Sequence, residues 1–307
     1  MSRSHQPAAP PTHPAEALTG EAATSPAAAD PAADETRPAA KDETRLGRAD
    51  LHIHSVASDG TASVVAILEH VAAHGDLDVI AITDHERIDA AVAARSMALD
   101  RGLPFEVVVG EEVTTLGGHL LALGIERPIR PYRSLRTTIA DVHEAGGIAI
   151  PAHPLVPYPL CAQGSVLRRL LDDPDAAVHP DALETFNPTA LGRPWHSRVV
   201  RFAERHGLSA VGNSDAHVLD AIGTGWTTFP GRTAGDLRAA IAAGTTVHGG
   251  SFHGTGGQVG VFGRQLVKRA VDARDEVAGR LRKDGTGRDH GYPGGRQRPP
   301  RFDPGAR

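Results

Sequence analysis

Short apolar runs that end in histidine or acidic residues recur along the chain, and they constrain its fold more than any other feature. In the first run, 51–54, apolar residues alternate with His52 and His54, so both imidazole rings would project from one face of a strand. The run 78–85 is continuously apolar before its polar end, as in a strand buried on both faces of a parallel sheet. Helix-like segments separate such runs. This alternation predicts a parallel α/β architecture.

Residues that can bind metal ions lie at or just past the carboxyl end of one expected strand after another. They are His52 and His54, Asp84 and His85, Glu111 and Glu112, His153, Glu184, and Asp215 and His217. In a closed α/β barrel these strand ends converge on one face, where active sites are built. Imidazole nitrogens and carboxylate oxygens are ligands of divalent transition metals. Chance would supply one or two such cases but rarely six, so the sequence predicts a metal centre.

The residues alone leave two questions about the metal ligands open. His70 and His74 are four residues apart on an expected helix, a spacing that can bind metal. Their polar neighbours and the lack of a matching glutamate favour a solvent-facing pair. Spacing does not choose between Glu111 and Glu112 as an acidic ligand. Asp59, five residues after the first histidine pair, adds oxygen ligands.

Composition divides the chain into three parts. Residues 1–46 are rich in Ala, Pro, Thr and Glu and have almost no large apolar residues, which predicts a disordered tail. Residues 47–253 form the expected folded domain. Residues 254–307 combine an expected basic amphipathic helix, about 258–283, with a disordered Gly-, Arg- and Pro-rich end. The basic segment could contact RNA, anionic lipid or the acidic domain, or pack on the domain as a solvated helix.

Charge and cysteine content exclude several classes of protein. The net charge of −5 separates into −2 over 1–48, −9 over 49–253 and +6 over 254–307. An acidic central part is not typical of an autonomous nucleic-acid binder, so nucleic acid is expected only as a possible substrate. The single cysteine, Cys161, excludes an internal disulfide and a cysteine-based zinc site. No apolar run long enough to span a membrane and no secretory signal is visible, which favours a cytoplasmic location.

An ordered set of short motifs carries a resemblance to a known family. The motifs are His52-x-His54, Ser58-Asp59-Gly60, Thr83-Asp84-His85, Gly110-x-Glu112, His119, Ala152-His153-Pro154 and Ser214-Asp215-x-His217. Together, over about 49–250, they resemble the PHP superfamily, the polymerase and histidinol phosphatase domain. The resemblance implies a distorted seven-stranded (β/α) barrel, up to three metal ions and, for most members, hydrolysis of phosphoesters. It makes 47–253 a PHP metallohydrolase domain.

The resemblance also implies ligands for two or three divalent ions. The residues fall into three groups: His52, His54, Glu112 and Asp215 for the first ion, Glu112 again with His119 and His153 for the second, and Asp59, His85 and His217 for the third. The Gly-x-Glu pattern of the family selects Glu112 over Glu111. Asp84 would support neighbouring ligands or belong to an ordinary strand-end turn. Mn, Zn or Fe ions suit this set, and the oxygen ligand Asp59 tilts the third position toward Mn or Fe.

The implied activity is hydrolysis by a hydroxide that bridges the metal ions. The expected substrate is a small phosphorylated metabolite, a nucleotide or a short oligonucleotide. Arg193 would clamp the phosphate and His196 would protonate the leaving group. The alternatives for these two residues are a surface arginine before a helix and a structural histidine at a helix start.

Two alternative functions remain, because some segments depart from the motifs of the phosphoesterase branch and because a metal site can exist without turnover. The segment 110–115, Gly-Glu-Glu-Val-Thr-Thr, with Gly118-His119 soon after, looks closer to the branch that contains carbaryl-type carbamate or ester hydrolases. Residues 86–90 depart from the Asp-Thr-Val-x-Gly of the small-nucleotide phosphoesterase branch. A metal-binding regulatory module without turnover is the other reading, although a complete ligand set favours an enzyme. The sequence leaves the oligomeric state open.

Overall fold

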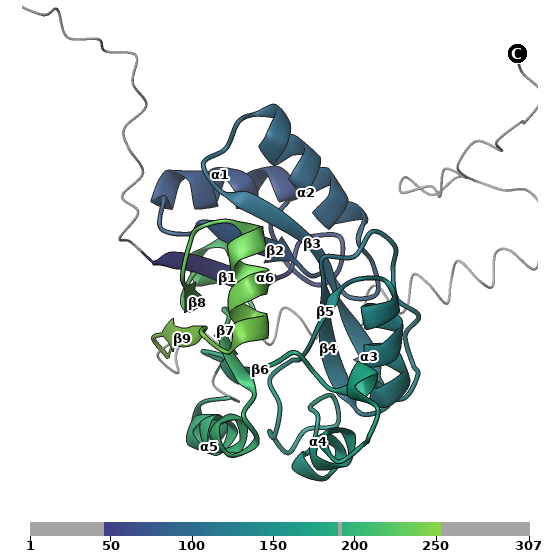
Figure 1. Cartoon of the computed structure of the whole chain (residues 1–307). Helices are drawn as coiled ribbons and strands as arrows, with labels where there is room; N and C mark the ends of the chain where they lie inside the picture. The colour runs from purple at the N-terminus through teal and green to yellow at the C-terminus, as the bar shows by residue number, and fades with distance from the viewer. Residues whose placement is uncertain (1–45, 190–191, 253–307) are drawn as a thin grey trace, which may run out of the picture. The chain divides into compact units, whose positions relative to one another are not determined.

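The computed structural model describes residues 46–189 and 192–252 (Figure 1). The predicted tail, 1–46, lies outside the described residues except for Leu46. The basic amphipathic helix predicted over 258–283 and the Gly-, Arg- and Pro-rich end also lie outside them. The described strands and helices begin at Gly47 and end at Gly250. Within the described part of the chain, no helix has the length and apolar character needed to cross a membrane.

Among the described residues, seven strands form one sheet and two more form a separate pair. In the order β5-β4-β3-β2-β1-β8-β9 the large sheet contains β5 (Ile148–Pro151), β4 (Gly118–Leu123), β3 (Glu106–Thr115), β2 (Val79–Ile82), β1 (Gly47–Ile53), β8 (Gly225–Phe229) and β9 (Val247–Gly250). The small sheet pairs β6 (Ala182–Phe186) with β7 (Ser209–Gly212) in parallel. Only β1, β2 and β3 are parallel neighbours in the large sheet, and its other pairs are antiparallel. The predicted α/β class is confirmed, but the predicted parallel pairing holds in the large sheet only for β1 to β3, so the sheet is mixed.

Strand β3 changes its pairing partner at Gly110, which accounts for much of this mixture. Residues 106–109 pair in parallel with β2, and residues 110–115 pair antiparallel with β4. A Cβ atom at Gly110 would lie 2.7 Å from Leu123 Cδ2 and 3.2 Å from Thr83 Cγ2, so this crossing requires glycine. The hairpin continues through Gly118, whose φ of 120° strongly favours glycine. The strand is thus longer than its apolar run, 105–109, predicts.

The β6–β7 pair meets the large sheet along two edges. On one side, Thr227 Oγ1 bonds both the amide and the carbonyl of Gly212, at 3.0 and 2.9 Å. On the other side, the Asp181 amide donates to Ala149 O at 3.0 Å, and Asp181 Oδ2 accepts from Ala149 N at 2.7 Å. No strand ladder joins β5 to β6 in the described structure. The structure thus shows a curled seven-stranded sheet with a separate two-stranded sheet, and the closed (β/α) barrel stays a prediction.

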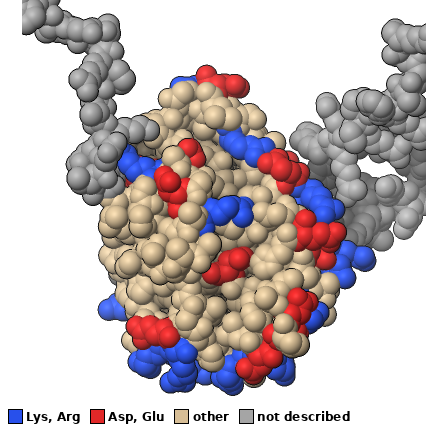
Figure 2. All heavy atoms as spheres, in the orientation of Figure 1, with Lys and Arg blue, Asp and Glu red and all other residues tan. Residues whose placement is uncertain are grey.

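In the described part of the chain, six α-helices and three short 3₁₀ helices connect the strands. They are α1 (Val64–His74), α2 (Asp89–Asp100), α3 (Leu135–Glu144), α4 (Gly164–Leu171), α5 (His196–His206) and α6 (Ala234–Ala243), with η1 (Ala176–Val178), η2 (Arg193–Trp195) and η3 (Leu219–Ala221). Ser63, Ser134 and Thr233 cap α1, α3 and α6 by accepting backbone N–H bonds. Side chains of both signs intersperse on the face shown in Figure 2.

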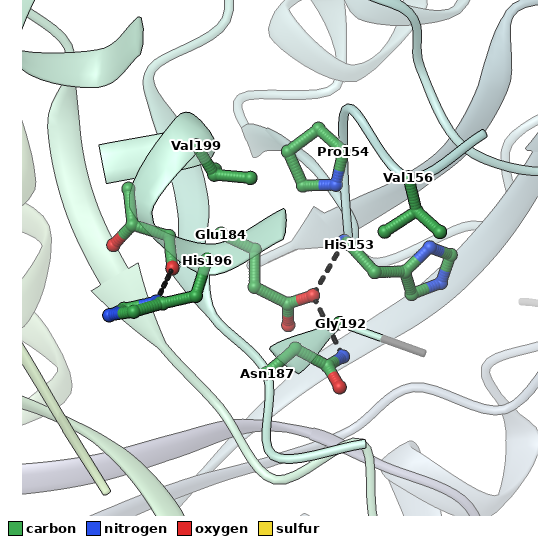
Figure 3. A pocket seen from close by; sticks show the side chains of 9 residues that line it. His153, Pro154, Val156, Glu184, Asn187, Gly192, His196 and Val199 are labelled. Carbon is green, nitrogen blue, oxygen red and sulfur yellow. Dashed lines mark hydrogen bonds between the residues drawn. The ribbon is translucent and has the colours of Figure 1, made fainter. Parts of the chain in front are cut away.

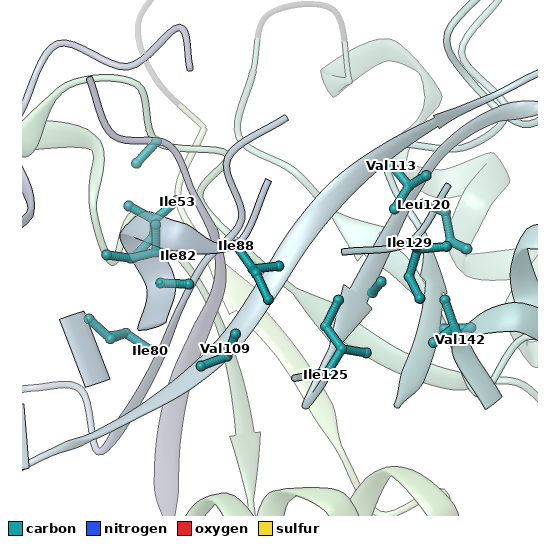
Figure 4. Packing of buried hydrophobic residues seen from close by; sticks show 14 of the residues in the cluster. Ile53, Ile80, Ile82, Ile88, Val109, Val113, Leu120, Ile125, Ile129 and Val142 are labelled. Atoms are coloured by element: carbon teal, nitrogen blue, oxygen red, sulfur yellow. The ribbon is translucent and has the colours of Figure 1, made fainter. Parts of the chain in front are cut away.

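Two apolar clusters hold the strands in place. One, which includes Leu51, Val79 and Phe229, packs against Leu237 and Ile241 of α6, the helix drawn in green across the sheet in Figure 1. The other packs strand residues against the α1–α5 helices and the loop around Ile129; Figure 4 shows part of it, including Ile80, Ile82, Val109 and Val142. Burial at roughly 25 cal/mol per Å² of apolar surface is the main favourable term for this fold. The clusters fix the strand ends from which the polar residues emerge.

His143 should make stability depend on pH at the β5–β6 junction. On α3, its Nδ1 lies 2.7 Å from Ala177 O and its Nε2 lies 2.9 Å from Asp181 Oδ2, so the imidazolium donates to both acceptors. The bond to Asp181 raises the pKa of His143 despite partial burial. This stability is fully present below the unfolded pKa, about 6.5, and is lost as pH rises through the folded pKa. We expect His143→Ala to lower the free energy of unfolding by about 1 kcal/mol at pH 6 and by less at pH 9, measured by urea titration.

Asp181→Asn is the matched control, because it leaves the imidazole in place and removes the charge that raises its pKa. This variant should lose the same pH dependence. Equal losses for His143→Ala at pH 6 and pH 9 would contradict the role of the ion pair.

Candidate metal centre

All nine predicted ligand side chains lie together in the structure. They come from β1 and the loop after it, from the residue run after β2, from β3 and β4, and from the loops after β5 and β7: His52, His54, Asp59, His85, Glu112, His119, His153, Asp215 and His217. Each has a nitrogen or carboxylate oxygen within 3.6 Å of another member. The large sheet and the β6–β7 pair therefore together collect polar residues that lie far apart in the sequence.

The first predicted group has the geometry of an enclosed four-ligand site. Nε2 of His52 and Nε2 of His54 each lie 3.4 Å from Glu112 Oε2 and 3.5 Å from Asp215 Oδ1. Both nitrogen atoms are buried and have no hydrogen-bond partner among the described residues. Buried polar atoms without partners are costly. Two nitrogens and two carboxylate oxygens converging on one point fit a divalent transition metal.

Glu112 also faces the second predicted group. Its Oε1 lies 2.7 Å from His119 Nδ1 and 3.1 Å from His153 Nε2, whereas its Oε2 belongs to the first group. The two oxygens of one carboxylate thus point to two different sets of imidazoles. This is the arrangement that a carboxylate bridging two ions needs. Glu111, the alternative, faces the other way and accepts a bond from the Ile129 amide.

The third predicted group is less separate than the resemblance implies. Asp59 Oδ1 lies 3.2 Å from His217 Nε2, and Asp59 Oδ2 lies 3.6 Å from His85 Nε2. The other ring nitrogen of His85, Nδ1, lies 3.3 Å from Glu112 Oε2. His85 also forms a compact group with Glu112 and His119. Its ring therefore stands between the second and third groups.

Glu184 is a buried carboxylate that contacts two of the predicted ligand residues on their side away from Glu112. Its Oε1 lies 3.0 Å from His52 Nδ1 and accepts from Asn213 Nδ2 at 2.8 Å. Its Oε2 accepts from the His153 amide at 2.6 Å and from Asn187 Nδ2 at 3.2 Å (Figure 3). Such a carboxylate behind a ligand fixes the histidine tautomer and ring orientation. Glu184 lies at a strand end that the sequence predicts, but the sequence carries no signal for these partners, which lie up to 132 residues away.

Asp84 supports the loop that carries Asp59. One oxygen accepts from the Ser55 amide at 2.8 Å and from Ser58 Oγ at 2.5 Å, and the other accepts from Ser55 Oγ at 2.6 Å. The side chain is buried and these bonds occupy both oxygens. Its position agrees with a supporting role for the neighbouring ligands.

The histidines of the centre lower the pKa values of its carboxylates, so these carboxylates stay ionised. Burial alone would raise the pKa of Glu112, but the surrounding imidazoles hold it well below its usual value. Burial likewise opposes ionisation of Asp215, and nearby histidines, His52 first, keep its pKa low. Burial and the charge of His217 lower the pKa of His54 to about 4. The two carboxylates and His54 thus have the protonation states that metal binding requires. Burial opposes protonation of His52, but Asp215 and Glu112 raise its pKa above the usual value, so this ring must release a proton when an ion binds.

Two residues of the centre have backbone conformations that are uncommon outside glycine. His153 has φ of 32° and Asp215 has φ of 50°. Such conformations cost on the order of 1–3 kcal/mol and persist where the surroundings hold them in place, typically at functional sites. The Glu184 contact with the His153 amide is one such restraint.

His196 lines a small pocket beside His153, and Arg193 lies three residues earlier, in η2. His153, Glu184, Asn187 and His196 all line this pocket (Figure 3). The Nδ1–H of His196 donates to Thr185 O at 2.9 Å, and its ring packs edge-on against Phe186. The Arg193 guanidinium lies over the Phe252 ring, 5.6 Å from its centroid. The structure does not bring either side chain into the nine-residue cluster.

Several known proteins are similar to this chain. A family model described as PHP-associated matches residues 193–246. An uncharacterized protein of Methanocaldococcus jannaschii is 32% identical over 151 residues, which are 46% of this chain and 81% of that protein. A 3',5'-nucleoside bisphosphate phosphatase of Chromobacterium violaceum is 33% identical over 90 residues, 28% of this chain and only 30% of that enzyme.

Two solved structures share the fold. One is a two-domain protein from Bacteroides vulgatus containing a predicted PHP-like metal-dependent phosphoesterase, with TM-score 0.54 and 17% identity over 73% of this chain and 71% of that one. The other is PsfC from Pseudomonas syringae, with TM-score 0.51 and 17% identity over 74% of this chain and 98% of that one. The likeness of this chain to both structures is one of fold. The chain belongs to the PHP superfamily.

Proposed function

We propose that the protein is a metal-dependent phosphoesterase acting on a small phosphorylated metabolite, a nucleotide or a short oligonucleotide. The observation that carries the proposal is the convergence of two unpartnered, buried histidine nitrogens with Glu112 and Asp215. The bisphosphate phosphatase that resembles part of the chain supports a phosphorylated substrate. The same centre could serve a carbamate or ester hydrolase, which the 110–115 segment favours.

The nine clustered residues would hold two to three divalent ions, with Mn, Zn or Fe as candidates. Bound there, such ions supply positive charge that stabilises phosphate oxygens and generate a nucleophile from water at neutral pH. Glu112 and Asp215 contribute the ionised oxygens, and Glu184 keeps the His52 ring in one orientation. Burial of these groups excludes bulk water and strengthens each electrostatic interaction.

Arg193 is the proposed phosphate clamp, and His196 the proposed proton donor to the leaving group. Among residues 46–189 and 192–252, no carboxylate forms an ion pair with Arg193, so its guanidinium remains able to bind an anion. His196 would have to act through Nε2, because Nδ1 is held by Thr185 O. Both roles require the substrate to reach across the pocket next to His153.

We expect Arg193→Ala to lower kcat/KM for phosphoesters roughly 10- to 150-fold, because one charge-assisted contact is worth about 1.5–3 kcal/mol. Metal content should stay at the wild-type level. Arg198→Ala is the matched control, since Arg198 stacks on Trp195 one turn further along the same segment. Steady-state kinetics that show equal, small effects for the two variants would place the clamp elsewhere.

The proposed function is tested on the full chain purified without added metal. Elemental analysis should find two to three divalent transition-metal ions, and a panel of phosphomonoesters, phosphodiesters, bisphosphates, carboxylesters and carbamates should show turnover of a phosphoester. Removal of the ions by a chelator should abolish turnover, and their return should restore it. Turnover confined to carbamates or esters would favour the alternative, and full activity without any metal would overturn the mechanism.

A further inference from the structure

His52 and His153 are anchored by different chemical groups on the side away from Glu112. The Nδ1 of His52 meets a carboxylate oxygen of Glu184 at 3.0 Å, and the side chain of Glu184 is fully buried. The Nδ1 of His153 meets the Sγ of Cys161 at 3.3 Å. A carboxylate is a strong acceptor, whereas a thiol sulfur is a weak one. The two histidines therefore differ in how firmly their rings are held.

The strength of the Nδ1 anchor affects metal affinity, because each ring can bind an ion through Nε2 only in the tautomer that carries its proton on Nδ1. Nε2 of both residues faces Glu112, so that nitrogen must present a lone pair to bind an ion. The proton then resides on Nδ1 and is donated to the anchor. For His153 the acceptor of this N–H is Cys161 Sγ. An anchor behind a ligand histidine typically accounts for 10- to 100-fold in metal affinity.

The loop around Cys161 is built so that the sulfur stays against His153. Leu155 N donates to Ala162 O at 2.9 Å, and Gln163 Nε2 donates to Cys161 O at 2.9 Å. The same loop accepts a bond from the His119 amide at Leu160 O, 2.9 Å. It therefore contacts both histidines of the second group. Cys161 itself is buried, with 4% of its surface exposed.

The more weakly anchored histidine, His153, is also more exposed to solvent than His52. The side chains of His52 and His54 are 0% exposed, whereas that of His153 is 16% exposed. A more exposed site with a weaker anchor should release its ion more readily.

We propose that the metal centre fills unequally, and that Cys161 is a positioning residue for His153 that sets the weaker affinity. The ion held by His52, His54, Glu112 and Asp215 binds tightly. The ion held by Glu112, His119 and His153 exchanges with solvent. The inference rests on the proposed metal centre, and it concerns binding alone, so it can be tested without a known substrate.

The test is a titration of the metal-free full chain with Mn²⁺, in which free Mn²⁺ is counted by electron paramagnetic resonance. The wild type should show one tight and one weaker class of site. Cys161→Ala should weaken only the weaker class, by about 10-fold, and Cys161→Ser should bind Mn²⁺ in that class more tightly than Cys161→Ala, because a hydroxyl also accepts the N–H. Any activity lost in Cys161→Ala should return at correspondingly higher Mn²⁺, which a purely structural defect would not allow.

Leu167→Ala is the matched control. Leu167 is fully buried in the helix that follows the loop, so its truncation should lower the melting temperature and leave both classes unchanged. The inference is overturned if Cys161→Ala leaves both classes intact, or if it weakens both equally. A protein that binds two classes of Mn²⁺ as described but hydrolyses no phosphoester would refute the proposed function and leave this inference standing.

Discussion

Replacing Glu112 with glutamine is expected to remove metal from the first and second groups together and to lower kcat/KM roughly 10²- to 5 × 10³-fold. The two oxygens of Glu112 face separate sets of histidines, so the amide removes one shared negative charge and offers only one acceptor. Breaking a buried charge pairing costs about 3–5 kcal/mol, which corresponds to that loss in rate. Elemental analysis and steady-state kinetics on the same preparation measure both effects.

Glu111→Gln is the neighbouring control, because Glu111 points away from the cluster. Its Oε1 accepts from the Ile129 amide, and burial with the nearby charge of Glu86 raises its pKa to about 7. The stability that this neutral carboxyl provides is present at low pH and is lost as pH rises from about 4.5 to 7. The variant should keep its metal and should be no less stable than the wild type at pH 8. Loss of metal from Glu111→Gln alone would reverse the assignment of the two glutamates.

Replacing Glu184 with glutamine is expected to weaken ion binding at the first group about 10- to 100-fold. The carboxylate accepts four bonds, from His52, Asn213, the His153 amide and Asn187. A glutamine presents an NH₂ group in place of one oxygen, so two of these donors would then face another donor. His52 would lose its fixed orientation, or the His153 backbone would lose its restraint. Metal titration and thermal unfolding of the same variant measure the two consequences.

Asp78→Asn separates metal binding from general damage to the fold. Asp78 is also buried, and it accepts from Arg232 Nε at 2.7 Å and from the Arg48 amide at 3.0 Å, outside the metal centre. We expect this variant to lower the melting temperature and to keep its metal. A similar loss of metal from Asp78→Asn and Glu184→Gln would indicate that Glu184 acts only through stability.

The sequence allowed the clustering of polar strand ends to be predicted because that pattern is local. The two-residue spacing of His52 and His54 places both rings toward Glu112, as a strand with period two requires. The apolar composition of a run such as 78–85 predicts that its strand is buried, and β2 is buried throughout. The ion assigned to each ligand stays a prediction, and His85 shows why, because its ring contacts two groups.

The parts that the sequence could not predict depend on distant partners. The strand after Gly110 pairs with β4 instead of β2, although the local pattern only indicates a strand and a turn. Glu184 meets His52 across 132 residues, and Cys161 meets His153 through a loop whose path composition does not specify. The family resemblance points to Arg193 and His196, and the structure places both outside the ligand cluster. His196 lines the small pocket, and Arg193 lies over the Phe252 ring.

The junction between β5 and β6 gives the metal centre a place to open. His153 follows β5, whereas Glu184 belongs to β6 and Asp215 follows β7, so the ligands and their anchor stand on both sides of this junction. In the described structure, hydrogen bonds cross this junction near both of its ends, between Ala149 and Asp181 at one end and between His153 and Glu184 at the other. Separating β5 from β6 therefore breaks no strand ladder. Ion entry and release should follow this line, and amide hydrogen exchange along β5 should slow when the centre is loaded.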